Sequence, residues 1–360
     1  MDLKPNHRLP LMAMGMISLL LALFGGTQRL GWDLPTLTTA LPASHGPLMV
    51  GAFLGTVIGL ERAVALGRLW GYLGPLTTGL GGLLLIAGTA PIPAKVLILT
   101  GSFMLSLVFV AFILRQFAWF TVIMMAGALF WLAGNVLWLG GAPLHAVVWW
   151  WMGFLLLTIA GERMELGRML FISMGRQAQL LLFVLMASAG IVVTLQHPDA
   201  GTRLLGLGMV AIALWLGRHD VARRTIRQTG LPRFIAVNLL AGYIWLALCG
   251  TLLLLFGADF GGLRYDAVLH SFFLGFIFSM IFGHAPVIFP AVLGRGMLYR
   301  PAFYIHVALL HLFLVLRVGA DLAQEILPRN LGGLLNALTL VVFLVNTVLA
   351  IRACAARGKG

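Results

Sequence analysis

Twelve apolar windows dominate this sequence of 360 residues. Each is long enough to cross a lipid bilayer, which takes about 20 apolar residues in a helix. No window alternates polar and apolar residues as a membrane barrel strand does, and unpaired backbone groups are too costly in hydrocarbon. We therefore predict an all-α polytopic membrane protein with about twelve transmembrane helices. The windows lie at 9–26, 45–60, 70–90, 94–114, 117–139, 145–161, 177–195, 202–217, 234–256, 266–291, 301–318 and 331–352.

The composition agrees with this prediction. The chain is 61% hydrophobic and 10% charged, with a mean hydropathy of +1.01. Such a chain needs the lipid bilayer as its partner. The segments 26–44, 218–233 and 256–266 are the notable stretches outside the windows, and none is large enough for a soluble domain. We expect a single transmembrane domain over residues 1–360.

The net charge of +13 indicates membrane orientation here rather than a nucleic-acid partner. If both termini lie inside, the inner segments hold about three times as many Lys and Arg residues as the outer segments. Basic residues collect on the cytoplasmic side of membrane proteins. We therefore predict a multi-pass protein of the bacterial inner (plasma) membrane with both termini cytoplasmic.

Three windows share one outline, in which a histidine comes first and a Leu-Gly-Arg triplet comes last. The histidines are His45, His145 and His270, and the triplets end at Arg68, Arg168 and Arg295. The three windows run in the same direction at a period of four helices. We predict three parallel four-helix repeats, at about 1–116, 117–233 and 234–360, related by an axis along the membrane normal.

A histidine inside a membrane span is a functional hypothesis by default, because an unpartnered polar ring is costly there. His45 and His270 are expected at equal depth, and two neutral imidazoles on separate helices can hold a haem iron from both faces. His145 is a third ligand for copper, a ligand of a second haem, or a position without a ligand role. The alternative for all three is hydrogen bonding within the bundle.

His284, His306 and His311 form a second group nearer the inside. His284 is expected roughly 21 Å below His270, at 1.5 Å per residue, so it cannot share a metal with that residue. A second, inner metal site of His284 with His306 is one hypothesis for this group, and helix-to-helix hydrogen bonds are the other. His311 is expected near mid-depth and turned partly away from His306.

Arg317 and Arg329 are among the few basic residues expected on the outer side. A guanidinium can hold a carboxylate in a bidentate pair. These two side chains therefore fit the propionates of a haem, and the alternative is ordinary pairing with Asp321 or Glu325.

Two acidic-basic pairs, Glu61-Arg62 and Glu162-Arg163, are expected at the inner ends of their helices. They are either ion pairs that mark a helix end or carboxylates that conduct protons inward. The run Trp149–Trp151 is expected in the aromatic belt at the outer interface. No phosphate-binding loop, HExxH or paired CxxC motif is present, so hydrolases and nucleotide-driven pumps are not indicated.

This pattern resembles subunit I of the haem-copper oxidases and nitric oxide reductases. The run His45-Gly46-Pro47-Leu48-Met49 is similar to the HGxxM motif on the second helix of that family. His45 and His270 match the family's low-spin haem ligands, which implies a haem b with two histidine ligands. The seventh helix lacks the family's histidine pair, and Ala146-Val147-Val148 stands where the family has a proline-glutamate motif. A conventional oxygen-reducing haem-copper centre is therefore not expected.

The chain is also similar to the NnrS family, small haem- and copper-containing relatives associated with nitric oxide metabolism. The similarity rests on the histidine-led second helix, on His270 with its Leu293-Gly294-Arg295 end, and on Leu316-Arg317-Val318. It implies nitric oxide or nitrosative-stress handling, or electron transfer at the membrane with quinol or cytochrome c as the donor. Whether the protein is an enzyme, as a membrane haem oxidoreductase acting on nitric oxide, stays open at this point.

The alternative function is a transporter or channel for a metal ion or small solute, with the same histidines along its path. Parallel repeats suit a transporter, but a helix broken at mid-membrane is then expected. Gly283–Pro290 is the best candidate for such a break, because it contains a glycine and two prolines.

Overall fold

The computed structural model describes residues 2–167 and 173–357. The regular secondary structure of these residues is entirely helical. Twelve of the helical spans within them are long and apolar enough to cross a membrane, and each coincides with one predicted window. The prediction of an all-α polytopic membrane protein is therefore confirmed. The division into three repeats stays a prediction, and Arg168, which closes its second copy, lies outside the described residues.

The chain divides into two compact units, and two helices contribute residues to both. The first contains Met1–Phe154 and Ile288–Arg295, and the second contains Leu155–Val287 and Gly296–Gly360. The helices of the first unit are α1 (Pro5–Arg29), α2 (Leu41–Pro47), η1 (Leu48–Leu54), α3 (Gly55–Leu66), η2 (Leu69–Tyr72), α4 (Leu73–Ala87), α5 (Pro91–Arg115), α6 (Trp119–Leu139), the first part of α7 (Leu144–Gly167) and the last part of α13 (Ser279–Leu293).

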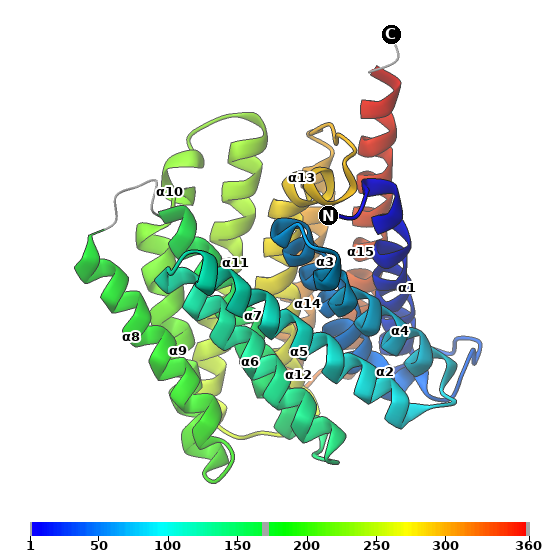
Figure 1. The fold of residues 1–360 in the computed structure, drawn as a ribbon. Coiled ribbons are helices and arrows are strands. Elements are labelled where there is room, and N and C mark those ends of the chain that lie inside the picture. The colour runs from blue at the N-terminus through cyan, green and yellow to red at the C-terminus, as the bar shows by residue number, and fades with distance from the viewer. Residues whose placement is uncertain (1, 168–172, 358–360) are drawn as a thin grey trace. The chain divides into compact units, whose positions relative to one another are not determined.

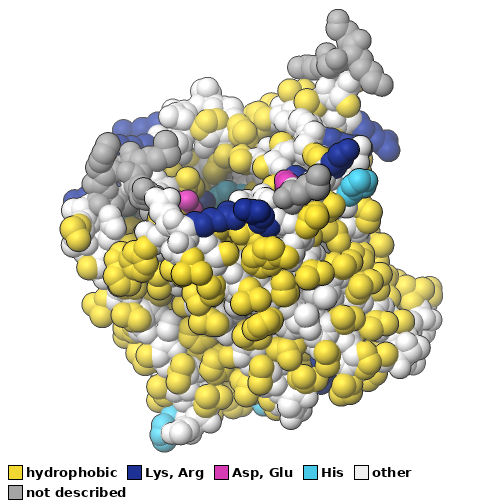
Figure 2. All heavy atoms as spheres, viewed as in Figure 1, with side chains coloured by type: hydrophobic (Ala, Val, Ile, Leu, Met, Phe, Trp, Pro, Cys, Tyr) yellow, Lys and Arg dark blue, Asp and Glu magenta, His cyan; other side chains and the backbone are white. Residues whose placement is uncertain are grey.

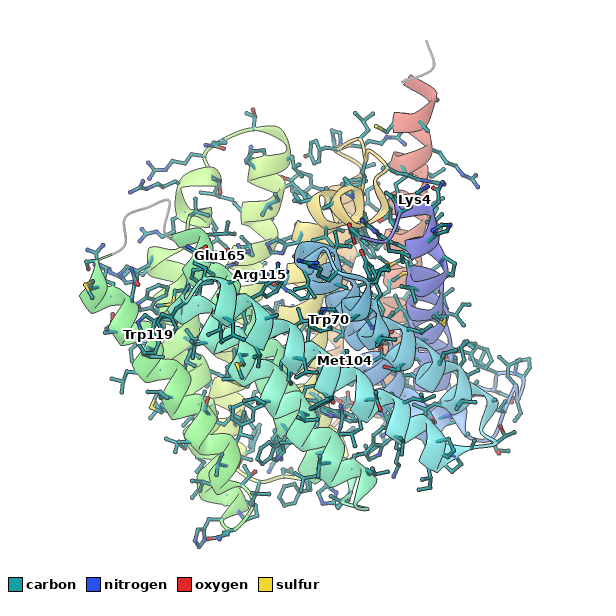
Figure 3. The ribbon with its side chains drawn as sticks, in the orientation of Figure 1. Lys4, Trp70, Met104, Arg115, Trp119 and Glu165 are labelled. Carbon is teal, nitrogen blue, oxygen red and sulfur yellow. The ribbon has the colours of Figure 1, made fainter. Side chains whose placement is uncertain are left out.

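The first unit is built from neighbouring antiparallel helices joined by short loops. The helix α1 packs on α2, η1 and α4, while α5 packs on both α4 and α6 (Figure 1). The segments α2, η1 and α3 form one continuous span, Leu41–Leu66. Arg115, labelled in Figure 3, donates from Nη1 to the carbonyl oxygen of Leu66 at 3.2 Å. This bond joins the end of α5 to the end of α3.

Aromatic side chains fill the interior of the first unit. Trp131 stacks on Phe154, with ring centroids 4.7 Å apart, and its ring fits against Gly55, where a Cβ atom would clash. The side chains of Trp149–Trp151 are buried, and Trp151 Nε1 donates to Asn135 Oδ1 at 3.1 Å. The aromatic-belt prediction for these tryptophans is therefore wrong, because a belt needs rings on the membrane-facing surface.

The second unit contains the remaining helices. They are the last part of α7, then α8 (Met174–Val193), α9 (Pro198–His219), α10 (Ala222–Thr225), α11 (Gly230–Phe256), α12 (Gly262–His270), η4 (Ser271–Phe278), the first part of α13 (Ser279–Leu293), α14 (Phe303–Ala323) and α15 (Ile326–Arg357). The helix α9 packs on α8 and α11, and α14 packs on α15. Since α13 runs through Gly283–Pro290 as a helix, the break proposed there is not found.

Small residues allow close helix packing in the second unit. A Cβ atom on Gly206 of α9 would lie 2.6 Å from the carbonyl oxygen of Gly250 on α11. Helices in lipid gain stability from this close backbone approach, because no hydrophobic effect drives them together there. Large apolar side chains instead face outward, and Ile244 is 71% exposed. The helix surfaces visible in Figure 2 are mostly hydrophobic, as lipid contact requires.

Candidate functional site

His45 lies in α2 of the first unit, where it packs against α1. Its Nδ1 atom is 2.7 Å from the carbonyl oxygen of Ala22. Gly26, one turn further along α1, makes room for the ring, because a Cβ atom there would lie 2.7 Å from Nδ1. A carbonyl oxygen only accepts hydrogen bonds, so Nδ1 carries the proton and donates it. The neutral imidazole of His45 therefore has its lone pair on Nε2, the atom that binds iron or copper in many metalloproteins.

His270 ends α12 in the second unit and has the same tautomer. Its Nδ1 atom lies 2.9 Å from the backbone carbonyl oxygen of Asp266 and 3.3 Å from the carboxylate oxygen Oδ2 of the same residue. The backbone oxygen accepts from Nδ1–H, which again leaves the lone pair on Nε2. The spacing of four residues on one helix brings the two side chains together.

A buried ion network surrounds Asp266. Arg317 of α14 holds its carboxylate through two parallel bonds, from Nε to Oδ2 at 2.9 Å and from Nη2 to Oδ1 at 3.1 Å. Arg329 of α15 reaches Oδ1 with Nη2 at 3.3 Å, and its Nε lies 3.2 Å from Oδ1 of Asp321. The side chain of Arg317 is 8% exposed and that of Asp321 is 0% exposed. Two carboxyl groups and two guanidinium groups therefore meet inside the second unit.

The helix ends position this network. The helix α14 ends at Ala323 and α15 begins at Ile326, so Arg317 and Arg329 lie close to the turn between them. Asp266 is near the start of its membrane span, Gly262–Leu293. The ion network therefore lies at one end of the three spans, where a charge costs less than at mid-membrane.

Part of this network is predicted from the sequence. Pairing with Asp321 or Glu325 is the alternative expected for the two arginines, and the contact of Arg329 with Asp321 has that form. Asp266, the residue that joins both arginines to His270, was not predicted. The available signal was an acidic residue four positions before a histidine in an apolar window. A role of Arg317 and Arg329 towards haem propionates stays a prediction.

His45 and His270 share a second local feature. Among the described residues, a π-helical segment begins directly after His270, at Ser271–Phe278, and another begins three residues after His45, at Leu48–Leu54. Such segments are rare, and they occur mostly at functional sites, because an extra residue in the turn disturbs the regular hydrogen bonding. Hydropathy alone gives no sign of them.

His284 has a different environment in the second unit. Its Nδ1–H donates to the carbonyl oxygen of Met280 at 2.6 Å, and its Nε2 lies 2.8 Å from Nη2 of Arg163. Arginine is always a donor, so the lone pair of Nε2 accepts this bond. In this arrangement the lone pair is not available to a metal ion.

His306 and His311, both on α14, have the opposite tautomer. Trp245 Nε1 donates to Nδ1 of His311 at 3.0 Å, and indole is only a donor, so the proton of His311 is on Nε2. The amide nitrogen of Asn346 lies 3.2 Å from Nδ1 of His306 and donates in the same way. Helix-to-helix hydrogen bonds, the second hypothesis for this group, therefore describe these contacts. An inner metal site of His284 with His306 would need new tautomers and new partners.

Two further predicted residues lie elsewhere. His145 is half-buried near the start of α7. Arg62 Nη2 is 3.4 Å from Glu61 Oε1, which agrees with an ion pair at the end of α3.

Among the residues that the structure describes, no group of three or more His, Cys, Asp or Glu side chains is arranged to hold a metal ion. A haem iron with two axial ligands needs only one nitrogen lone pair from each face of the porphyrin. His45 in the first unit and His270 in the second unit each have the tautomer that an axial ligand needs.

The fold and composition place this chain among polytopic helical membrane proteins. A family model described as a domain of unknown function, DUF8744, matches residues 8–352, and the chain belongs to that family. No curated protein and no solved structure matches the chain.

Proposed function

We propose that this protein is a haem-binding integral membrane protein, with His45 and His270 as the axial ligands of a haem b. The observation that carries the proposal is the tautomer of these two rings. Each donates Nδ1–H to a protein oxygen, and this contact fixes the ring and strengthens Nε2 as a ligand. The π-helical segments that follow both histidines add support.

The chemistry of such a haem is electron transfer or the binding of a small gas. The similarity to the NnrS family and to subunit I of the haem-copper oxidases supports nitric oxide or nitrosative-stress handling, or membrane electron transfer from quinol or cytochrome c. In either case the contacts at Nδ1 hold the imidazole rings of His45 and His270 in place. His145 is proposed as a ligand for copper or for a second haem. A comparison of metal and haem content in the wild type and in His145→Ala tests this role.

A reduced-minus-oxidised absorption spectrum of the purified protein tests the haem proposal. We expect a Soret band and an α band in the wild type, and the loss of both in His45→Ala and in His270→Ala. His219→Ala is a matched control, because His219 also donates from Nδ1 to a carbonyl oxygen four residues earlier, at 3.0 Å, and has no proposed ligand role. A colourless wild type from haem-replete cells would overturn the proposal.

The proposed location is the bacterial inner membrane, with both termini cytoplasmic. The excess of basic residues in the proposed inner segments supports this orientation. A phosphatase fused after the C-terminus is expected to be inactive and a fluorescent protein at the same place to be bright. The reverse result would place the C-terminus outside.

Transport of a metal ion or small solute remains the alternative proposal. The buried ion network of the second unit favours it, because ionisable residues within membrane spans often mark a solute path. The uninterrupted helix at Gly283–Pro290 does not support it. Proteoliposomes test this alternative through their uptake of a metal ion or small solute. Uptake by a haem-free wild type that is abolished in Arg317→Gln would favour transport.

A further inference from the structure

We infer that Asp266 is a positioning residue for His270, and that Arg317 and Arg329 are present to hold its carboxylate in place. This inference rests on the proposed haem function and deepens it. It assigns the buried ion network a role in setting the donor strength of one axial ligand. All of these residues lie in the second unit.

The first step is the double contact at Nδ1 of His270. The backbone oxygen of Asp266 lies at 2.9 Å and its carboxylate oxygen Oδ2 at 3.3 Å. A backbone carbonyl alone would already fix the tautomer. The carboxylate adds a negative charge on the same side of the ring, which makes the opposite nitrogen, Nε2, a stronger donor to a metal.

The second step is the immobilisation of the carboxylate. An aspartate side chain can rotate away from a neighbouring ring, but Arg317 holds both oxygens of Asp266 in a bidentate pair. Arg329 adds a third contact from another helix, at 3.3 Å from Oδ1. With three helices meeting at one carboxylate, its orientation towards His270 is set by the fold.

A comparison with Asp321 distinguishes the position of the Asp266 carboxylate from its charge. Asp321 belongs to the same network and has the same carboxyl group, but its ion pair is with Arg329 at 3.2 Å, and no contact among the described residues joins it to His270. If the network only supplied charge balance, Asp266 and Asp321 would be interchangeable. If Asp266 positions His270, only Asp266 affects the ligand directly.

The experiment compares two double variants that remove one charge of each sign. Asp266→Asn with Arg329→Gln loses the carboxylate at His270, and Asp321→Asn with Arg329→Gln keeps it. Both leave the net charge unchanged. The measurement is a redox titration of the haem in the purified full-length protein, with circular dichroism and size-exclusion chromatography as checks of folding.

We expect the Asp266 double variant to favour the reduced haem about tenfold more than the wild type, because second-shell changes typically alter metal affinity by 10–100-fold. For one electron this is an upward shift of about 59 mV. The Asp321 double variant is expected to shift the ratio of reduced to oxidised haem less than about threefold. A folded Asp266 variant that retains no haem, beside a control that does, supports the same conclusion. Equal shifts in the two variants, or no shift in either, would overturn it.

A second variant covers the case in which Asp266→Asn does not fold. Asp266→Glu keeps the charge that both arginines need, but its longer side chain cannot keep the fork with Arg317 and the contact with His270 together. We expect this variant to retain the haem and to shift the ratio of reduced to oxidised haem at least about threefold. A redox titration curve identical to that of the wild type would overturn the inference. A wild type without haem bands refutes the proposed function itself. If the wild type contains haem but the Asp266 variants titrate like the wild type or like the Asp321 control, only the role of Asp266 is refuted.

Discussion

Replacing Arg317 by methionine tests the energetic role of the buried ion network. The substitution keeps a long, flexible side chain but removes the bidentate partner of Asp266, whose side chain is only 15% exposed. Removing one partner of a buried ion pair typically costs 3–5 kcal/mol, because the other charge stays buried. Arg329 remains 3.3 Å from the same carboxylate, so we expect the lower end of this range, about 3 kcal/mol.

Two further variants make the result specific. Arg317→Met combined with Asp266→Leu removes both partners and leaves Arg329 with Asp321, so we expect at least half of the lost stability to return. Arg203→Met is the surface control, because Arg203 pairs with Asp199 while their side chains are 43% and 63% exposed. We expect Arg203→Met to cost much less than Arg317→Met, because water screens an exposed ion pair.

The assay is equilibrium unfolding in mixed micelles with increasing SDS, followed by circular dichroism. The free energies of unfolding of the three variants are compared with the wild type at one temperature and pH. Our reasoning would be refuted if Arg317→Met cost no more than Arg203→Met. It would also be refuted if the double variant were no more stable than Arg317→Met alone, because the buried charge would then not be the cause.

Two predictions concern glycines at close helix contacts, each with a matched control. Gly26→Ala is expected to displace the ring of His45, since a Cβ atom there would lie 2.7 Å from Nδ1, and to reduce haem bands in the absorption spectrum; Gly46→Ala, with nothing within 4 Å, should leave them unchanged. Gly206→Leu is expected to destabilise the second unit by about 2 kcal/mol or more through overpacking, whereas Gly217→Leu on the same helix meets open space and should stay within about 0.5 kcal/mol of the wild type. SDS unfolding measures the second pair, and similar losses for both members would contradict the packing argument.

Hydropathy predicted the helices well and the side-chain partners poorly. The twelve windows were found because each span is a local property of about 20 residues, and the structure places a helix at each one. The tryptophans Trp149–Trp151 were misassigned for the opposite reason. Whether an apolar ring faces lipid or protein depends on neighbouring helices, and lipid and core select the same residue types.

The histidines show the same limit at the candidate site. The sequence identified His284, His306 and His311 as unusual, but their hydrogen bonds come from distant residues. Arg163 precedes His284 by 121 positions, and Trp245 precedes His311 by 66. Spacing along one helix cannot predict such partners, yet these partners decide which nitrogen carries the proton.

The sequence by itself determined that this chain is a polytopic helical protein of a lipid bilayer, how many spans it has, and which few polar side chains lie in them. It could do so because the cost of an unpaired backbone group or a charge in hydrocarbon acts on each segment separately. Only the tertiary structure decided that Asp266 contacts Arg317 and Arg329, 51 and 63 residues away. A charge inside a protein is stabilised by whichever helix the fold brings beside it, and that neighbour is not encoded in any one window.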